Sequence, residues 1–174
     1  MMESFRSRAD RRGRPVMVEA WLSATAAPRD TAAQARVAGQ LAGYHAGHLI
    51  PARFGGPGDG RNLVPMPARI NTSYVKAIEN SLARHLASGP VFVRITVDYV
   101  SEAVVPSHIT YALFRRSADG ALLPLDGGSI VQAVGSEPSV PMGSIRDAYT
   151  GRIIPAREWL DVTSTRGLGP EGSH

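Results

Sequence analysis

A histidine, an asparagine and a glutamate near the middle of the chain have side chains that together could transfer a proton and bind a cation. His48 follows Gly47 in a stretch rich in glycine and proline, and Asn71 and Glu79 lie downstream of it. An imidazole exchanges a proton near neutral pH. The side-chain oxygens of asparagine and glutamate suit a hard cation such as Mg²⁺. The order of the three residues indicates metal-assisted acid–base chemistry.

Each of these residues also has an ordinary structural explanation. His48 alone could be a structural or exposed histidine, Asn71 could cap a helix, and Glu79 could be a surface charge. His45 lies three residues before His48 and leaves a Zn²⁺ site open. The chain has no cysteine, so thiolate metal sites and disulfides are excluded.

Two elements must position these side chains. Residues 43–67 predict a small hairpin, because short apolar runs at 48–50 and 63–64 flank a loop dense in glycine and proline. Residues 71–88 predict a helix. In that segment Val75, Ile78, Leu82 and Leu86 recur at helical spacing, and Gly89-Pro90 follows as a stop signal.

The rest of the chain favours an antiparallel sheet, and the fold class is therefore α+β. Residues 91–100 alternate apolar and polar side chains, residues 109–115 resemble a partner strand, and residues 121–125 a further one. Residues 15–23 predict a first strand. Residues 24–41 leave a short helix and an irregular connection equally open.

The central residues resemble the DNA/RNA non-specific endonuclease family of ββα-metal (His-Me finger) nucleases, and specifically its bacterial toxin-associated branch. The resemblance covers about residues 43–82. It is carried by Ala46-Gly47-His48-Leu49-Ile50-Pro51-Ala52-Arg53-Phe54-Gly55-Gly56, Asn62-Leu63-Val64-Pro65, Asn71 and Ile78-Glu79-Asn80.

The resemblance implies a role for each matching residue. His48 corresponds to the general base, Asn71 to the single protein ligand of Mg²⁺, and Glu79 to the helix glutamate. Mn²⁺ is a possible substitute metal. Eight residues of helix rise about 12 Å, so Glu79 is expected to bind a metal-bound water or to orient Asn71 or His48 rather than share direct coordination with Asn71.

Three arginines and an asparagine near this unit are further candidates. Arg53 is expected to contact the phosphate, because it lies five residues after His48. Arg61 and Arg69 are weaker candidates for substrate binding. Asn62 is a candidate substrate contact that would more simply stabilise the loop or orient His48.

One departure from the family is visible at the catalytic strand. Many members have Asp-Arg-Gly-His, whereas this chain has His45-Ala46-Gly47-His48. The missing arginine removes one candidate phosphate ligand, and the missing aspartate leaves the partner of His48 open.

Composition agrees with a polyanionic substrate. The 174 residues carry a formal net charge of +4, and Lys76 is the only lysine. Arginine grips phosphate oxygens with a planar fork, although an arginine-rich composition can equally reflect a GC-rich genome.

We expect residues 1–14 to be a basic flexible arm, residues 15–134 the nuclease domain, and residues 135–174 a C-terminal extension with a disordered end. Within that extension, Ile153, Ile154, Trp159 and Leu160 could anchor the tail to the body. His85 is expected to face solvent and His108 to have no special role.

These observations predict a Mg²⁺-dependent, largely sequence-non-specific endonuclease acting on DNA, with RNA as a second candidate substrate. The resemblance also suggests an antibacterial toxin domain with a cognate acidic immunity protein. No membrane span and no standard signal peptide are evident, so we expect a cytoplasmic protein or a toxin delivered into a target cell. The alternatives are a non-catalytic nucleic-acid-binding module that retains the fold, and a protein-interaction domain.

Overall fold

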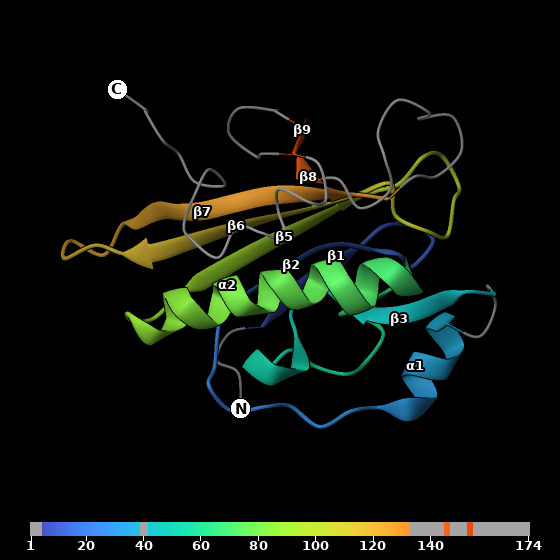
Figure 1. The fold of residues 1–174 in the computed structure, drawn as a ribbon, viewed down its shortest axis with the longest axis horizontal. Coiled ribbons are helices and arrows are strands. Elements are labelled where there is room, and N and C mark those ends of the chain that lie inside the picture. The colour runs from blue at the N-terminus through green and yellow to red at the C-terminus, as the bar shows by residue number, and fades with distance from the viewer. Residues whose placement is uncertain (1–4, 39–41, 133–144, 147–152, 155–174) are drawn as a thin grey trace.

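The strands of the computed structural model form two antiparallel sheets (Figure 1), in the part of the chain that the structure describes, residues 5–38, 42–132, 145–146 and 153–154. The larger sheet has seven strands in spatial order, β1 (Arg6–Ala9), β2 (Pro15–Trp21), β5 (Phe92–Asp98), β6 (His108–Arg116), β7 (Leu122–Val131), β8 (Ile145–Arg146) and β9 (Ile153–Ile154). The smaller sheet pairs β3 (Tyr44–His48) with β4 (Leu63–Pro67). The prediction of an α+β fold with an antiparallel sheet and a central hairpin is confirmed.

Two α-helices complete the described fold, α1 (Thr31–Ala38) and α2 (Val75–Ala87). In Figure 1, α2 runs along one face of the larger sheet, and β3 and α1 lie together at one end of it. The sequence left a short helix and an irregular connection equally open for residues 24–41, and the structure contains both, an irregular segment followed by α1. None of the helices in the described residues is long and apolar enough to cross a membrane.

The core lies between the larger sheet and α2. Strand pairing aligns Val18 with Ile95, and Ile95 with Tyr111, and all three side chains are buried. Ile78 and Leu82 of α2 belong to the same apolar cluster. The strand predicted from the alternation in residues 91–100 is present, and its apolar side packs in the same cluster as α2, which the helical spacing in residues 71–88 buries on the sheet.

The opposite face of the sheet carries a second, smaller cluster. Trp21, Phe92 and Phe114 stand in register on β2, β5 and β6, with neighbouring ring centroids 5.4 and 6.2 Å apart. Glu19 lies beside them and pairs with Arg6 at 2.7 Å and Arg94 at 2.8 Å. Two arginines compensate one buried carboxylate there, which is why an acidic side chain is tolerated in the sheet.

Residues 6–14 are ordered into the fold, so the prediction of a flexible basic arm is wrong for them. Arg6–Ala9 forms β1 and pairs with β2. Arg14 then binds Asp10 at 2.6 Å, and its guanidinium lies 4.3 Å from the centre of the Tyr99 ring. Arg6 pairs with Glu19 on β2, and Arg14 contacts Tyr99 just after β5, and local sequence reveals neither contact.

His85 is buried, so the expectation that it faces solvent is wrong. Its Nε2 lies 3.0 Å from Asp126 Oδ2 on β7, and Arg115 donates a hydrogen bond to its backbone oxygen at 2.5 Å. These contacts join the end of α2 to the sheet across 41 residues of sequence.

The predicted tail anchor is confirmed for Ile153 and Ile154, because β9 pairs with β8, and β8 with β7. Trp159, Leu160 and the residues after 154 lie outside the described residues. The division of the chain at residues 14 and 134 therefore stays a prediction.

Candidate active site

One cavity brings together the four residues that the sequence selected most strongly. It has a volume of about 240 Å³ and is lined by His48, Asn71, Glu79 and Arg53, together with Arg29, Gln34, Ala46 and Ala52. Strand β3, the turn inside the hairpin loop, α1 with the segment before it, and α2 with the turn before it all contribute. The walls are mostly polar or charged, which suits an anionic substrate and not an apolar ligand.

His48 is the last residue of β3 and pairs with Leu63 of β4. Its Nε2 is buried and has no hydrogen-bond partner among the described residues. Burial, and after it the positive charge of Arg29, lower the pKa of His48 below the ordinary value of 6.5. The imidazole is therefore neutral at neutral pH and able to accept a proton.

A tight turn after His48 directs Arg53 toward the cavity. Residues Ala52–Phe54 form a 3₁₀ turn, η1, with Phe54 buried in the core and Arg53 exposed. Gly55 ends the turn with φ of 90°, a conformation that other residues adopt only with strain. At Gly56 a Cβ atom would lie 1.8 Å from the backbone oxygen of Ile50, so only glycine fits. The Phe-Gly-Gly sequence thus shapes the wall of the site.

Asn62 holds this loop in place. Its Oδ1 accepts from the backbone N–H of Ile50 at 2.9 Å, and its Nδ2 donates to the backbone oxygens of Ile50 at 2.8 Å and Pro57 at 2.9 Å. The side chain is fully buried. The suggestion that Asn62 contacts substrate is therefore wrong. It stabilises the loop, which was the simpler alternative.

Asn71 and Glu79 reach the same cavity although eight residues separate them. With 3.6 residues per turn, eight residues of regular α-helix end about 80° away from their starting direction. Residues Ile70–Tyr74, however, form a π turn, η2, before α2 begins. A π turn holds more residues per turn and reduces that angular difference, which aligns the two side chains.

Asn71 has a partner on the hairpin. Its Nδ2 lies 3.3 Å from Nδ1 of His45, the residue at the position where the family motif has aspartate. This contact leaves the amide oxygen of Asn71 free for a cation. Burial raises the pKa of Glu79, and the positive charges of Arg53, Lys76 and Arg29 oppose that rise.

Arg29 and Gln34 are the cavity residues that sequence reasoning missed. Ser23 and Ala27 donate backbone hydrogen bonds to Phe54 and Ala52 at 2.9 and 2.8 Å, which lays the segment before α1 along the 3₁₀ turn. Arg29 makes no ion pair among the described residues. No motif marks it in the sequence. The one available signal was the missing arginine of the catalytic strand, because a phosphate ligand absent there would have to come from another part of the chain.

The other two candidate arginines lie outside the cavity. Arg61 is held by Asp59 and lines a second cavity. Arg69 is exposed on the connection between β4 and the π turn, and neither cavity includes it.

The residues present fit a hard divalent cation. No cluster of three or more histidine, cysteine or acidic side chains suited to a metal occurs in the described part of the chain. Mg²⁺ does not need one, because it usually keeps several waters and binds through one or two protein oxygens. The amide oxygen of Asn71 and the carboxylate of Glu79 are such donors.

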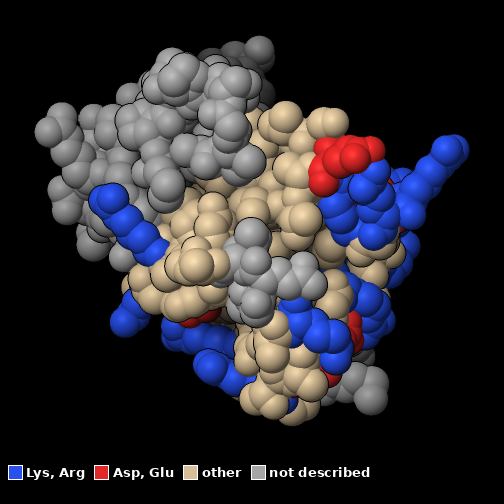
Figure 2. Space-filling view, turned by 90° about the vertical axis from the view of Figure 1, so that its right-hand side faces the viewer, with Lys and Arg blue, Asp and Glu red and all other residues tan. Residues whose placement is uncertain are grey.

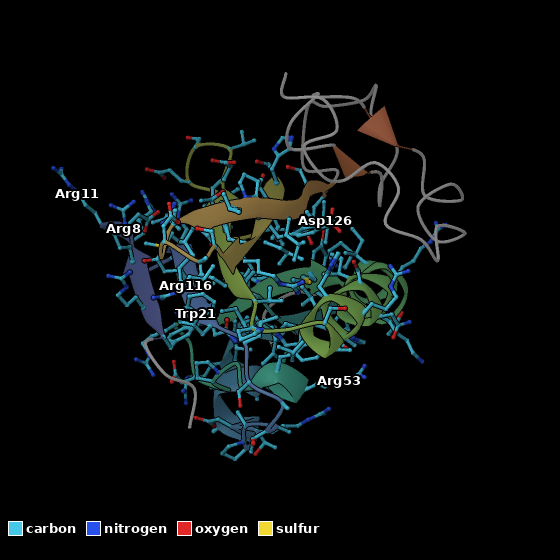
Figure 3. The ribbon with its side chains drawn as sticks, turned by 90° about the vertical axis from the view of Figure 1, so that its left-hand side faces the viewer. Arg8, Arg11, Trp21, Arg53, Arg116 and Asp126 are labelled. Carbon is cyan, nitrogen blue, oxygen red and sulfur yellow. The ribbon has the colours of Figure 1, made fainter. Side chains whose placement is uncertain are left out.

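Basic side chains are widespread on the surface. On the face drawn in Figure 2 they extend further than acidic ones. Figure 3 shows Arg8, Arg11 and Arg116 on one side of the larger sheet and Arg53 on the other, beside the helices. Arg29 and Arg53 place positive charge at the cavity itself, which favours a polyanion and makes its binding dependent on salt.

Comparisons with known proteins agree with this geometry. The model of the DNA/RNA non-specific endonuclease family matches residues 3–113. A solved extracellular endonuclease matches with a TM-score of 0.52 and 20% identity, covering 82% of this chain and 76% of its own. NucA from Streptococcus agalactiae with a magnesium ion bound gives a TM-score of 0.52, 20% identity, and coverage of 86% and 76%. EndoG in the EndoG/EndoGI complex gives 0.52, 17%, and coverage of 90% and 75%. A search of curated proteins gave no match. At these identities the solved structures show a shared fold.

Proposed function

Because the chain belongs to the DNA/RNA non-specific endonuclease family, we propose that it hydrolyses phosphodiester bonds of DNA, and RNA as a second substrate, in a Mg²⁺-dependent reaction. The observation that carries this proposal is the convergence of His48, Asn71, Glu79, Arg53 and Arg29 on one cavity of about 240 Å³.

His48 acts as the general base. Its neutral imidazole takes a proton from the attacking water, whose oxygen forms a bond to phosphorus as the bond to the 3′ oxygen breaks. The lowered pKa of His48 keeps it unprotonated at neutral pH.

Asn71 is the proposed direct ligand of Mg²⁺, with Glu79 holding a metal-bound water or taking part in coordination. When bound, the ion stabilises negative charge on the phosphate and on the leaving oxygen. Mn²⁺ offers the same ligand preference and should substitute. NucA, which shares the fold, was crystallised with magnesium.

Arg29 and Arg53 hold the phosphate group. Both line the cavity, and a guanidinium can donate two parallel hydrogen bonds to phosphate oxygens. Arg29 thereby replaces the arginine that the family motif places directly before Gly47. Contacts limited to the phosphate backbone of the nucleic acid do not distinguish one base from another, so cleavage should show little sequence preference.

A plasmid-cleavage assay with and without Mg²⁺ tests the proposal. His48→Ala should abolish cleavage without unfolding the protein, whereas His108→Ala, outside the cavity, should retain it. If purified protein leaves DNA and RNA intact with either metal, the catalytic proposal fails. Salt-sensitive binding without cleavage would instead favour a non-catalytic nucleic-acid-binding module.

We further propose that this nuclease acts as an antibacterial toxin that is delivered into a target cell and restrained by an acidic immunity protein. The basic composition is the support, because an acidic partner would steer toward the arginine-rich surface. EndoG, which has the same fold, was solved in complex with EndoGI. Active protein should then be tolerated in a bacterial host only together with its partner. High expression of active protein without a partner would contradict this role.

A further inference from the structure

A second cavity lies beside the catalytic one and shares Arg29 with it. Its volume is about 570 Å³, within the range of roughly 300–1,000 Å³ that is usual for small-molecule sites. Its walls come from the segment before α1, the loop after η1 and the residue that precedes β1, namely Phe5, Ala27, Pro28, Arg29, Asp30, Gly55, Pro57, Gly58, Asp59 and Arg61. A substrate whose phosphate is held by Arg29 therefore has open space on its other side.

The two loops that form this cavity are packed tightly against each other. At Gly58 a Cβ atom would lie 2.7 Å from the backbone nitrogen of Asp30 and 3.0 Å from the backbone oxygen of Pro28. Asp30 in turn accepts a hydrogen bond from the backbone of Ala33 at 2.9 Å and so caps α1. The cavity is thus formed by fixed backbone.

Arg61 presents a flat, fixed surface in this cavity. Its Nε and terminal nitrogen donate to the two carboxylate oxygens of Asp59 at 2.9 and 2.8 Å. Its guanidinium carbon lies 5.3 Å from the centre of the Phe5 ring. Both planar groups line the same cavity.

Arg61 and Arg29 differ in how their charges are compensated. Asp59 compensates the charge of Arg61, whereas Arg29 makes no ion pair among the described residues. Arg29 is therefore the stronger phosphate ligand. A compensated guanidinium beside an aromatic ring is suited to a planar, uncharged group, and nucleobases stack on both kinds of surface without much preference for sequence.

We propose that this second cavity binds the base of a nucleotide next to the scissile phosphate, stacked on Arg61 and Phe5. The inference rests on the proposed nuclease function, because it needs a nucleic acid held at Arg29. The stack would add affinity without base specificity, in agreement with a non-specific enzyme.

Two probes separate this subsite from the catalytic centre. Binding is measured in a His48→Ala background with Mg²⁺, using a short single-stranded DNA that contains 2-aminopurine, whose fluorescence falls when it stacks. Turnover is measured with methyl 4-nitrophenyl phosphate, which has no base, in the protein with His48 intact. Phe5→Leu and Arg61→Lys are the test variants, and Arg36→Lys on α1 is the matched control.

The parent should quench 2-aminopurine, and each test variant should lose quenching and bind DNA about tenfold more weakly. Turnover of the base-free ester should change less than about twofold in both, which also shows that the site is folded. The control should match the parent in both assays.

Other results would overturn the proposal. If the parent does not quench, or if both test variants bind and quench like the parent, no base is stacked there. If Arg61→Lys binds normally while Arg61→Gln does not, the cavity holds a phosphate instead. Failure of the protein with His48 intact to cleave DNA, RNA and the ester would refute the nuclease function itself, which is a separate outcome.

Discussion

Removing the side chain of Asn62 should destabilise the fold and damage the active site together. Asn62→Ala removes three hydrogen bonds, two buried ones to the backbone of Ile50 and a partly buried one to Pro57. The backbone bond from Leu49 to the Asn62 oxygen would remain. The substitution therefore removes only the side-chain hydrogen bonds that hold the two ends of the loop together.

The expected cost follows from the hydrogen bonds that are lost. A net contribution of about 1 kcal/mol for each bond gives a loss of about 3 kcal/mol in the free energy of unfolding. The buried backbone groups that stay unpaired could raise this value. For a protein of this size, 3 kcal/mol corresponds to a fall in Tm of about 6–12 °C.

Urea unfolding followed by circular dichroism measures the loss, and plasmid cleavage below Tm measures the effect on the site. Asn80→Ala on the exposed side of α2 is the matched control, and should change stability by less than about 0.5 kcal/mol. A loss below about 1 kcal/mol with unchanged cleavage would refute the idea that Asn62 holds the catalytic loop.

Four further outcomes follow from the structure. Burial and Arg29 lower the pKa of His48, so the acid limb of the pH–rate profile should have its midpoint below 6.5; Arg29→Gln removes a positive charge and should move that midpoint upward, and an unchanged or lower midpoint would contradict the assigned cause. Chelation with EDTA should abolish cleavage and added Mg²⁺ or Mn²⁺ should restore it, whereas cleavage that persists in EDTA would exclude a metal requirement. Gly56→Ala should strongly reduce the yield of folded protein, because its Cβ would lie 1.8 Å from a backbone oxygen; a normal thermal melt would show that the loop can move aside. His85→Leu should lower the free energy of unfolding by about 2 kcal/mol, since Asp126 loses its partner, and urea unfolding with no change would argue that the pair adds nothing.

The sequence predicts residues that line one cavity where the determinants of their placement are local. His48, the glycine-rich loop and the helix of Asn71 and Glu79 lie within one continuous stretch, and their spacing and turn residues indicate a hairpin followed by a helix. The half-buried strand at residues 92–98 is equally visible, because alternation depends only on which face is covered.

Features that depend on distant partners escaped prediction. Arg29 is placed by backbone hydrogen bonds from Ser23 and Ala27 to a turn more than twenty residues away. The burial of His85 requires Asp126 from another strand. The π turn at Asn71 leaves no recognisable periodicity, although it aligns Asn71 with Glu79.

If His48 is the proposed general base, its buried Nε2, which has no hydrogen-bond partner among the described residues, sets selection for activity against selection for stability at this residue. A buried polar atom without a partner costs about 1–3 kcal/mol, and an apolar side chain of similar size would remove that cost together with the imidazole. A library of variants screened only for thermal stability would therefore soon replace His48. On the proposed mechanism, a chain so altered would bind nucleic acid without cutting it, which makes His48 the position to change for capturing a substrate complex.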